Sequence, residues 1–318
     1  GSELTIGEGA QHIDVFAVDS NATYGDQPLQ MEGVATSGLE VVYESSNPDV
    51  LEVNGTKLKV RGAGVAVIYA NQSGDDNYFA ASERNATVVV YTAELEAKAD
   101  PKSKAYLEPV PELTYQLTGF VNDENASVLD LAPEISTTAT ADSVAGEYPI
   151  TTSGGAAANY HFHYVGSELT IGEGAQHIDV FAVDSNATYG DEPLQMEGVA
   201  TSGLEVVYES SNPDVLEVNG TKLKVRGAGV ATIFANQSGS DNYFAASERN
   251  ATVTVFTAEL EAKADPKSKA YLEPIPELTY QLTGFVNDEN ASVLDLAPEI
   301  STTATADSVA GEYPITTS

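Results

Sequence analysis

The sequence of 318 residues predicts an all-β protein, a tandem array of antiparallel β-sandwich domains that form an extended rod. Three observations predict this class. Short stretches rich in β-branched and aromatic residues alternate with clusters of turn residues. No stretch has the apolar spacing of an amphipathic helix of three turns. The third observation is that residues 166–318 repeat residues 1–153.

The repeat is unusually faithful. Of the 153 residue pairs, seven differ: Gln27/Glu192, Val67/Thr232, Tyr69/Phe234, Asp75/Ser240, Val89/Thr254, Tyr91/Phe256 and Val110/Ile275. The period of 165 residues is much longer than the roughly 20–50 residues of solenoid or propeller repeats. Each period should therefore hold one or two complete domains.

In the first half of the period, strands are expected at residues 12–18, 39–44, 65–70 and 86–91. The clearest local prediction is a hairpin over residues 50–60, because Asn54-Gly55 accepts the positive φ angles of a type I′ turn. Alternation along its second arm should place Lys57 and Lys59 outward and Leu58 and Val60 inward.

The second half of the period also has a β pattern. Strands are expected at residues 95–99, 113–120, 134–139, 146–151, 159–165 and 167–171. Residues 100–104 are predicted to be a polar turn. Only residues 123–129 suit a short helical turn, with Asp or Asn as the N-cap.

The differences between the two copies predict which strand faces are exposed. Val67 and Tyr69 lie two residues apart, as do Val89 and Tyr91, so each pair shares one face of its strand. Val-to-Thr changes introduce hydroxyl groups, which are costly when buried without a partner. We therefore expect these positions to lie on an outer face, with the two strands as neighbours.

Several motifs then match known families in order and spacing. Residues 113–120, 126–129, 144–151, 159–160 and 166–171 read LTYQLTGF, ASVL, VAGEYPIT, NY and GSELTI. This set resembles the MBG domain of large bacterial surface proteins, over roughly residues 93–173. Residues 37–43, 46–50, 62–64 and 77–81 read SGLEVVY, SNPDV, GAG and NYFAA. They resemble a bacterial Ig-like domain of the invasin and intimin group, over residues 12–92.

The resemblance implies a repetitive stalk or adhesive filament at a bacterial cell surface, such as the adhesins of gliding bacteria, and it supplies no catalytic residues. It suggests the following layout: residues 1–11 as the last strand of a preceding MBG-like domain, 12–92 Ig-like, 93–176 MBG-like, 177–257 Ig-like, and 258–318 an MBG-like domain that is incomplete at its C-terminus. We hypothesise that a neighbouring segment supplies the missing strand.

The charge and composition of the chain exclude several classes of binding partner. The chain has 48 acidic and 14 basic residues, a formal net charge of -34. Such a surface repels nucleic acid and anionic lipid. No run of residues is apolar enough for insertion into a membrane in this segment. The charge fits solubility and self-repulsion; calcium binding by the acidic loops stays open as the alternative. The absence of cysteine excludes thiol catalysis and disulfides.

No catalytic, cofactor-binding or metal-ligating residues are expected. His161 and His163 share a strand face as a metal pair would, but a zinc site needs a third ligand, so a structural role is favoured. The cluster at residues 75–77 loses a carboxylate in the second copy, and the cluster at 123–125 lacks EF-hand spacing. Solvation of loops is the favoured interpretation of both clusters.

The favoured function is a non-catalytic structural repeat of an extracellular adhesin, whose partners are neighbouring repeats. Short, proline-containing junctions would limit bending, and negative charge would keep the array open. The alternative is a module that binds an unknown surface glycan or protein. Its best candidate site is Tyr160, Phe162 and Tyr164, although their alternation with histidine predicts that they face the core.

Overall fold

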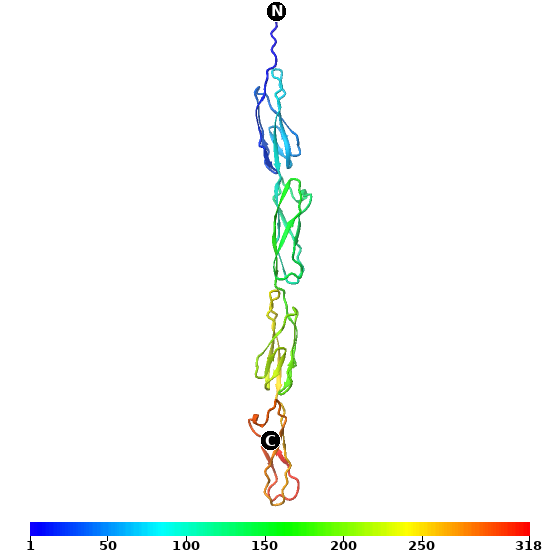
Figure 1. Cartoon of the computed structure of the whole chain (residues 1–318), viewed down its shortest axis with the longest axis vertical. Coiled ribbons are helices and arrows are strands. Elements are labelled where there is room, and N and C mark those ends of the chain that lie inside the picture. Colours follow the sequence, from blue (N-terminus) through cyan, green and yellow to red (C-terminus); the bar gives the residue numbers. More distant parts are fainter. The chain divides into compact units, whose positions relative to one another are not determined.

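The computed structural model describes residues 1–318, and the chain divides into two compact units, Gly1–Gly172 and Glu173–Ser318 (Figure 1). Apart from two short 3-10 turns, every regular element is a β-strand, which confirms the all-β prediction. No helix has the length and apolar character needed to cross a membrane. Unit 1 contains two sandwiches in succession, built from β1–β9 and from β10–β16.

The first sandwich of unit 1 consists of three sheets. They are β2-β9-β8-β5, β3-β7-β6 and β1-β4, with bounds β1 Ile13–Ala17, β2 Asn21–Thr23, β3 Leu29–Gln30, β4 Glu32–Ala35, β5 Val42–Ser45, β6 Leu51–Asn54, β7 Lys57–Val60, β8 Gly64–Asn71 and β9 Arg84–Tyr91. Alternate residues of β8 and β9 face inward, so that Ile68, Ala70 and Val88 are fully buried. The strands predicted at 12–18, 65–70 and 86–91 are confirmed within a few residues; the one predicted at 39–44 begins later, at Val42.

The hairpin over residues 50–60 is confirmed, but its turn type was predicted wrongly. Asn54 pairs with Lys57, so Gly55 and Thr56 are the central residues of the turn. Gly55 has φ +62, whereas neither Asn54 nor Thr56 has a positive φ. A positive φ at the first central position alone is the type II′ pattern, which also matches strand twist. Leu58 and Val60 are buried and Lys57 and Lys59 are exposed, as predicted.

The second sandwich of unit 1 has two sheets, β12-β10-β15 and β11-β16-β14-β13. Their bounds are β10 Ala93–Ala99, β11 Lys102–Ala105, β12 Tyr115–Thr118, β13 Glu134–Thr137, β14 Gly146–Ser153, β15 Tyr160–Val165 and β16 Ser167–Gly172. The polar turn predicted at residues 100–104 is wrong for residues 102–104, which belong to β11 (Lys102–Ala105). They form β11 because β16 pairs with them in parallel. This long-range partner cannot be recognised from the local composition.

The sandwiches are mixed rather than purely antiparallel. In unit 1, β2 pairs in parallel with β9, β10 with β15, and β11 with β16. Each of these pairs joins strands that are far apart in the sequence, whereas most strands that are close in sequence form antiparallel pairs. The 3-10 turn η1, Ala126–Val128, lies between β12 and β13. The side chain of its N-cap Asn125 accepts a hydrogen bond from Ser127 N, as the sequence predicted.

Unit 2 begins with a sandwich whose sheets repeat those of the first. They are β18-β25-β24-β21, β19-β23-β22 and β17-β20, with bounds β17 Ile178–Ala182, β18 Asn186–Thr188, β19 Leu194–Gln195, β20 Glu197–Ala200, β21 Val207–Ser210, β22 Leu216–Asn219, β23 Lys222–Val225, β24 Gly229–Asn236 and β25 Arg249–Phe256. Its buried core repeats that of the first sandwich except at Tyr189, which is half-buried where Tyr24 is buried; Met196, Leu216 and Ile233 are examples of repeated core positions.

The remaining residues of unit 2 form less sheet than their counterparts in unit 1. They contain two two-stranded sheets, β26-β27 and β28-β29, with bounds β26 Glu261–Ala264, β27 Tyr280–Thr283, β28 Ile300–Thr302 and β29 Ile315–Thr317, and the 3-10 turn η2, Ala291–Val293. No strand corresponds to β11.

The positions that differ between the copies lie where the sequence predicted. β8 and β9 are antiparallel neighbours, with Val67 opposite Thr87 and Val65 opposite Val89. Val67, Tyr69 and Val89 are half-buried and Tyr91 is exposed, whereas Val88 and Val90 on the opposite face are buried. In unit 2, Thr232 Oγ1 lies 3.5 Å from Thr252 Oγ1, so the introduced hydroxyl has a partner.

Candidate functional site: the joint inside each unit

The joint between the two sandwiches of unit 1 is short. Only Thr92 separates β9 from β10, so the chain passes from one sandwich into the next almost without a break. The predicted proline is not there. Neither residues 89–95 nor residues 171–178 contain proline, and the nearest downstream, Pro101, follows β10. Any stiffness of this joint must therefore come from contacts between the two sandwiches.

A carboxylate connects the two sides of the joint. Tyr24, from the first sandwich, donates its hydroxyl hydrogen to Glu124 Oε1 at 2.7 Å. Tyr160, at the start of β15, donates to the other oxygen, Glu124 Oε2, at 2.5 Å. Val121 N also donates to the Tyr160 hydroxyl, at 3.1 Å. Hydrogen bonds to a charged group are stronger than those between neutral groups, so Glu124 is the centre of the polar contacts.

Aromatic rings surround these hydrogen bonds. The Tyr24 and Tyr160 rings meet edge to face with centroids 5.6 Å apart, and the rings of Phe120 and Tyr160 meet likewise at 5.7 Å. Tyr24 and Tyr160 are only 6% and 5% exposed. They belong to one apolar cluster that also contains the core of the first sandwich and Leu95 from β10. The hydrophobic core is thus continuous across the joint.

The two sandwiches also come into close contact where the backbone at Gly25 approaches Val121. Gly25 has φ +96, and a Cβ at this position would lie 2.7 Å from Val121 Cβ. Only glycine combines this φ with this proximity at low cost. On the other side, Asn159 Oδ1 accepts a hydrogen bond from Ala63 N at 2.9 Å, while its backbone carbonyl accepts one from Ala93 N at 2.9 Å. Asn159 therefore joins both sandwiches through one residue.

Burial and the neighbouring carboxylate both keep the two phenols protonated. Burial, together with the hydrogen bond to Glu124, raises the pKa of Tyr160 to about 12. The same two causes raise the pKa of Tyr24 above its ordinary value. Both hydroxyl groups therefore remain hydrogen-bond donors throughout the physiological pH range.

The joint of unit 2 retains part of this arrangement. Tyr189 donates to Glu289 Oε1 at 2.7 Å, and a Cβ at Gly190 would lie 2.6 Å from Val286 Cβ. Tyr189 is half-buried, whereas Tyr24 is buried. The apolar cluster of unit 2 contains no residue of β26–β29.

Sequence reasoning did not identify this joint. Tyr24-Gly25 was interpreted only as the start of a turn, and Glu124 only as part of an acidic loop. The sequence carries no signal for it, because all but seven of the 153 residue pairs are identical and the retention of Tyr189 and Glu289 singles out neither residue.

The histidine pair lies on an exposed strand face, as expected. His161 Nε2 is 3.8 Å from Glu94 Oε2, and His163 Nδ1 is 3.7 Å from Glu94 Oε1. No group of three or more His, Cys, Asp or Glu residues in residues 1–318 is arranged to hold a metal ion. His12 and His177 are also exposed, each 67% by side chain.

The two acidic clusters form turns. Asp75 Oδ1 accepts hydrogen bonds from Asn77 N at 2.8 Å and Tyr78 N at 3.0 Å. In the second copy, Ser240 Oγ accepts from Asn242 N at 3.3 Å, so the hydroxyl takes over part of the same role. In the other cluster, Glu124 connects the joint and Asn125 caps η1.

The three aromatic residues of β15, Tyr160, Phe162 and Tyr164, differ in burial. Tyr160 is buried, as predicted. The prediction is wrong for Tyr164, which is 37% exposed; its ring stacks on Phe162 with centroids 5.7 Å apart, and its hydroxyl accepts a hydrogen bond from Gly155 N. Phe162 is half-buried and packs against the core of the first sandwich, so the three rings do not share one exposed face.

Comparison with known proteins gives one family and several distant structures. The model of the MBG domain (YGX type) family matches residues 95–170 and 260–318. No curated protein sequence matches the chain. Drosophila N-cadherin EC1-4 is similar at 13% identity and a TM-score of 0.27, over 79% of this chain and 76% of that one.

Two other solved structures have a comparable likeness. The S-layer protein rSbsC(31-844) is similar at 14% identity and a TM-score of 0.22, over 96% of this chain and 49% of that one, so this chain spans about half of its length. The Bacteroides ovatus glucan-utilization protein SGBP-B, in complex with a mixed-linkage heptasaccharide, is similar at 14% identity and a TM-score of 0.22, over 82% of this chain and 74% of that one.

Proposed function

We propose that this chain, whose residues 95–170 and 260–318 are MBG domains, is a non-catalytic structural repeat of a bacterial cell-surface adhesin or filament, and that it serves there as an extended stalk. The partners of each repeat would be its neighbours in the array. The family and the β-sandwich fold are of a non-catalytic, structural kind, and the geometry of the joint supports the more specific role.

One observation carries the proposal, namely the continuous core across the joint. A flexible linker would leave two sandwiches with separate cores. Here Leu95 and Tyr160 of the second sandwich belong to the same buried cluster as Ile68 and Val88 of the first. Bending the joint would expose these side chains and break the hydrogen bonds of Glu124. A module that transmits tension without bending needs such a joint.

The acidic surface supports the same role. At a net charge of -34, like charges on successive sandwiches repel one another, which favours separation over collapse. The acidic loops of residues 75–77 and 123–125 already have structural partners. We therefore propose that the stiffness of the joint does not require calcium.

Small-angle X-ray scattering of the whole chain, with calcium and with a chelator, tests the proposal. Strands of about 8–10 residues that rise about 3.3 Å each, together with the loops at both ends, give domains of roughly 35–40 Å, and four such domains predict a rod of about 140–160 Å in both conditions. A rod only with calcium would assign the stiffness to ions. A compact particle would contradict the stalk.

A variant pair makes the test specific to the joint. Glu124→Gln removes the charged acceptor of both tyrosines, and Glu134→Gln changes the same charge at an exposed position of β13. We expect only Glu124→Gln to broaden the distribution of maximum dimensions. Equal scattering from the two variants would show that the joint does not depend on this carboxylate.

A further inference from the structure

Three of the four basic residues of the first sandwich lie within five residues of one another. β7 directs Lys57 and Lys59 outward, and Arg61 follows the strand and is also exposed. β7 is the middle strand of the sheet β3-β7-β6, so these lysines do not protect a free sheet edge, where exposed lysine is common. Such a group of cations is an exception in a chain of 48 acidic and 14 basic residues. We call this surface the basic face.

The two lysines of the basic face have no anionic partner within the chain. Glu52, which lies opposite Lys59, is the one acidic residue among the cross-strand neighbours of β7. Arg61 already forms an ion pair with Glu52. Neither Lys57 nor Lys59 forms an ion pair. Two positive charges therefore remain available to an anionic group from outside.

The second copy repeats the basic face. Lys222 and Lys224 are exposed on β23, and Arg226 pairs with Glu217. None of the seven differences between the copies falls in residues 50–61. Each chain therefore has the basic face twice.

A different surface of the chain has the opposite charge. The sheet β11-β16-β14-β13 of the second sandwich directs Glu147 and Glu168 outward from β14 and β16, and both are exposed. Glu134 of β13 is exposed on the same side of this sheet. The cross-strand partners of these three glutamates carry no charge; they are Thr170, Pro149 and Ser153. We call this surface the acidic face.

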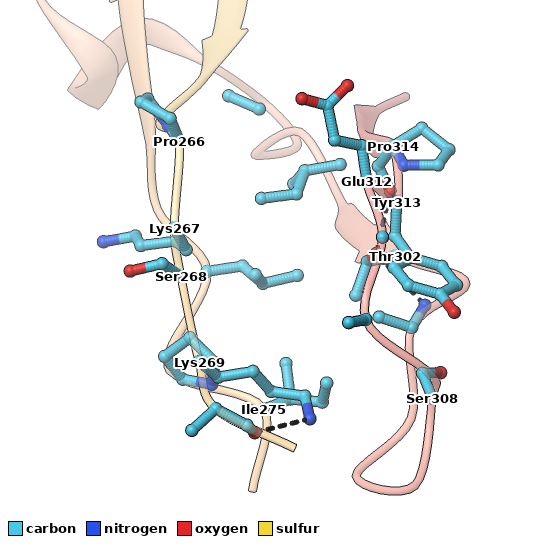
Figure 2. Close-up of a pocket in the computed structure, with 18 of the residues that line it drawn as sticks. Pro266, Lys267, Ser268, Lys269, Ile275, Thr302, Ser308, Glu312, Tyr313 and Pro314 are labelled. Atoms are coloured by element: carbon cyan, nitrogen blue, oxygen red, sulfur yellow. Dashed lines mark hydrogen bonds between the residues drawn. The ribbon is translucent and has the colours of Figure 1, made fainter. Parts of the chain in front are cut away.

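The counterpart of Glu147 in unit 2 is unpaired as well. Glu312 lines a pocket together with Lys267 and Lys269. Figure 2 shows its carboxylate apart from both ammonium groups, and no ion pair joins them. The absence of a cationic partner within the chain therefore recurs at this position in both copies.

The charges on the two faces have similar spacing. Lys57 and Lys59 are two residues apart on one strand, which is about 6.6 Å. Glu147 pairs with Thr170, so Glu168 lies diagonally across from Glu147, at about 7–8 Å. The flexible stems of the lysines can adapt to the difference. Two contacts between ammonium and carboxylate groups can therefore form at the same time.

We propose that the basic face of one copy of the chain binds the acidic face of a second copy, with the lysine pair of β7 or of β23 against Glu147 and Glu168. The inference rests on charge complementarity and does not depend on the stalk function. Because the two faces are different surfaces, the contact is heterologous, and every copy offers both. Assemblies should therefore grow in size as the concentration of the chain rises.

The net charge makes this association depend on salt in two opposite ways. At about 0.01 M salt the Debye length is about 30 Å, so two copies with a formal charge of -34 each repel one another as wholes. At about 0.15 M it is about 8 Å, which screens distant charges but not direct contacts. At about 1 M it is about 3 Å, and the contacts weaken too. Association should be strongest at the intermediate concentration.

Sedimentation velocity of the whole chain, over a concentration series at these three salt concentrations, tests the proposal. We expect reversible oligomers, with the largest association constant at the intermediate salt concentration. Lys57→Glu together with Lys222→Glu should lower that constant at least fivefold. Lys98→Glu together with Lys263→Glu is the matched control, because it changes the net charge equally at exposed positions outside the basic face. A wild-type chain that stays monomeric throughout, or equal association of both variants, would overturn the proposal.

A mixing experiment tests whether these two faces bind each other. Glu147→Lys should weaken association as well, because it places like charges together. This variant keeps the basic face, and the chain with Lys57→Glu and Lys222→Glu keeps the acidic face. The mixture should therefore form mixed oligomers at least fivefold more strongly than either variant alone. A mixture that associates no better would contradict the pairing. Poly-glutamate that binds these lysines on a monomeric wild-type chain would assign the basic face to a foreign acidic partner instead.

Discussion

Residues 93–153 and 258–318 have the same sequence except at Val110/Ile275, yet they form different amounts of sheet. In unit 1, β10 runs for seven residues and β14 for eight. In unit 2, their counterparts β26 and β29 run for four and three. Leu95 is 0% exposed, whereas its counterpart Leu260 is 38% exposed. A single added methylene group cannot cause such a difference.

The difference comes from β15 and β16, which follow the repeated sequence in unit 1. β15 pairs with β10, and β16 pairs with β11 and β14, so both sheets of the sandwich gain a strand. The parallel partner turns residues 102–105 into β11 and buries Lys104, whose ammonium group donates to two backbone carbonyls. The local sequence is therefore compatible with strands at these positions, but the strands form fully only where β15 and β16 pair with them.

The largest expected effect is at Leu95. Leu95→Ala should lower the free energy of unfolding of unit 1 by about 2–5 kcal/mol, because a fully buried side chain leaves a cavity. Leu260→Ala, the same change in the same local sequence, should cost less than half as much. Chemical denaturation of each single variant measures the two effects. Equal losses would mean that the two domains are equally packed in solution.

A smaller effect is expected at the joint. Glu124→Gln should destabilise unit 1 by about 1–3 kcal/mol, because a charged acceptor of two hydroxyl groups becomes a neutral amide. Glu289→Gln should cost roughly half, because Glu289 accepts only from Tyr189 among the tyrosines. Thermal unfolding of the two variants gives the comparison. A larger effect in unit 2 would contradict the role of Tyr160.

The joint of unit 1 should also respond to alkaline pH. The pKa of Tyr160 is about 12 in the folded chain, above its ordinary value of 10.0. Its contribution to stability is therefore complete below pH 10 and is lost as the pH rises through 12. Spectrophotometric titration of phenolate should lose a late component near pH 12 in Tyr160→Phe. An unchanged late component would assign it to another tyrosine.

The smallest effect is expected on the outer face of β8. Val67→Thr reproduces the residue of the second copy at a half-buried position and should change stability by less than about 0.5 kcal/mol. Val88→Thr, on the buried face of β9, places a hydroxyl in the core and should cost about 1–3 kcal/mol. The denaturation midpoints of the two variants measure the two losses of stability. If Val67→Thr lowered the stability as much as Val88→Thr, the outer face of β8 would have to be covered.

Much of the fold could be predicted from local sequence, where the pattern alone fixes the element. The hairpin of residues 50–60 and the cap at Asn125 are examples, since turn chemistry and alternation act over a few residues. The turn type was wrong because the pairing of Asn54 with Lys57 places Gly55 at the first central position.

The joint and the strand β11 could not be predicted in this way. Both depend on partners far along the chain: Glu124 is 100 residues from Tyr24, and Lys102 pairs with Leu169. Lysine and serine in residues 102–104 suggest a turn unless the partner strand is known. The predicted domain boundaries and the partners of the chain stay predictions.

Hydrogen exchange, measured by mass spectrometry on the whole chain, tests the central claim most directly. Peptides that contain Val110 or Ile275 are distinguishable by mass and report on the two copies of one sequence in one sample. If β15 and β16 complete the sandwich, the amides of residues 102–105, in peptides that extend to Val110, should exchange at least tenfold more slowly than those of residues 267–270, in peptides that extend to Ile275. Equal exchange would contradict the claim that these two strands cause the difference.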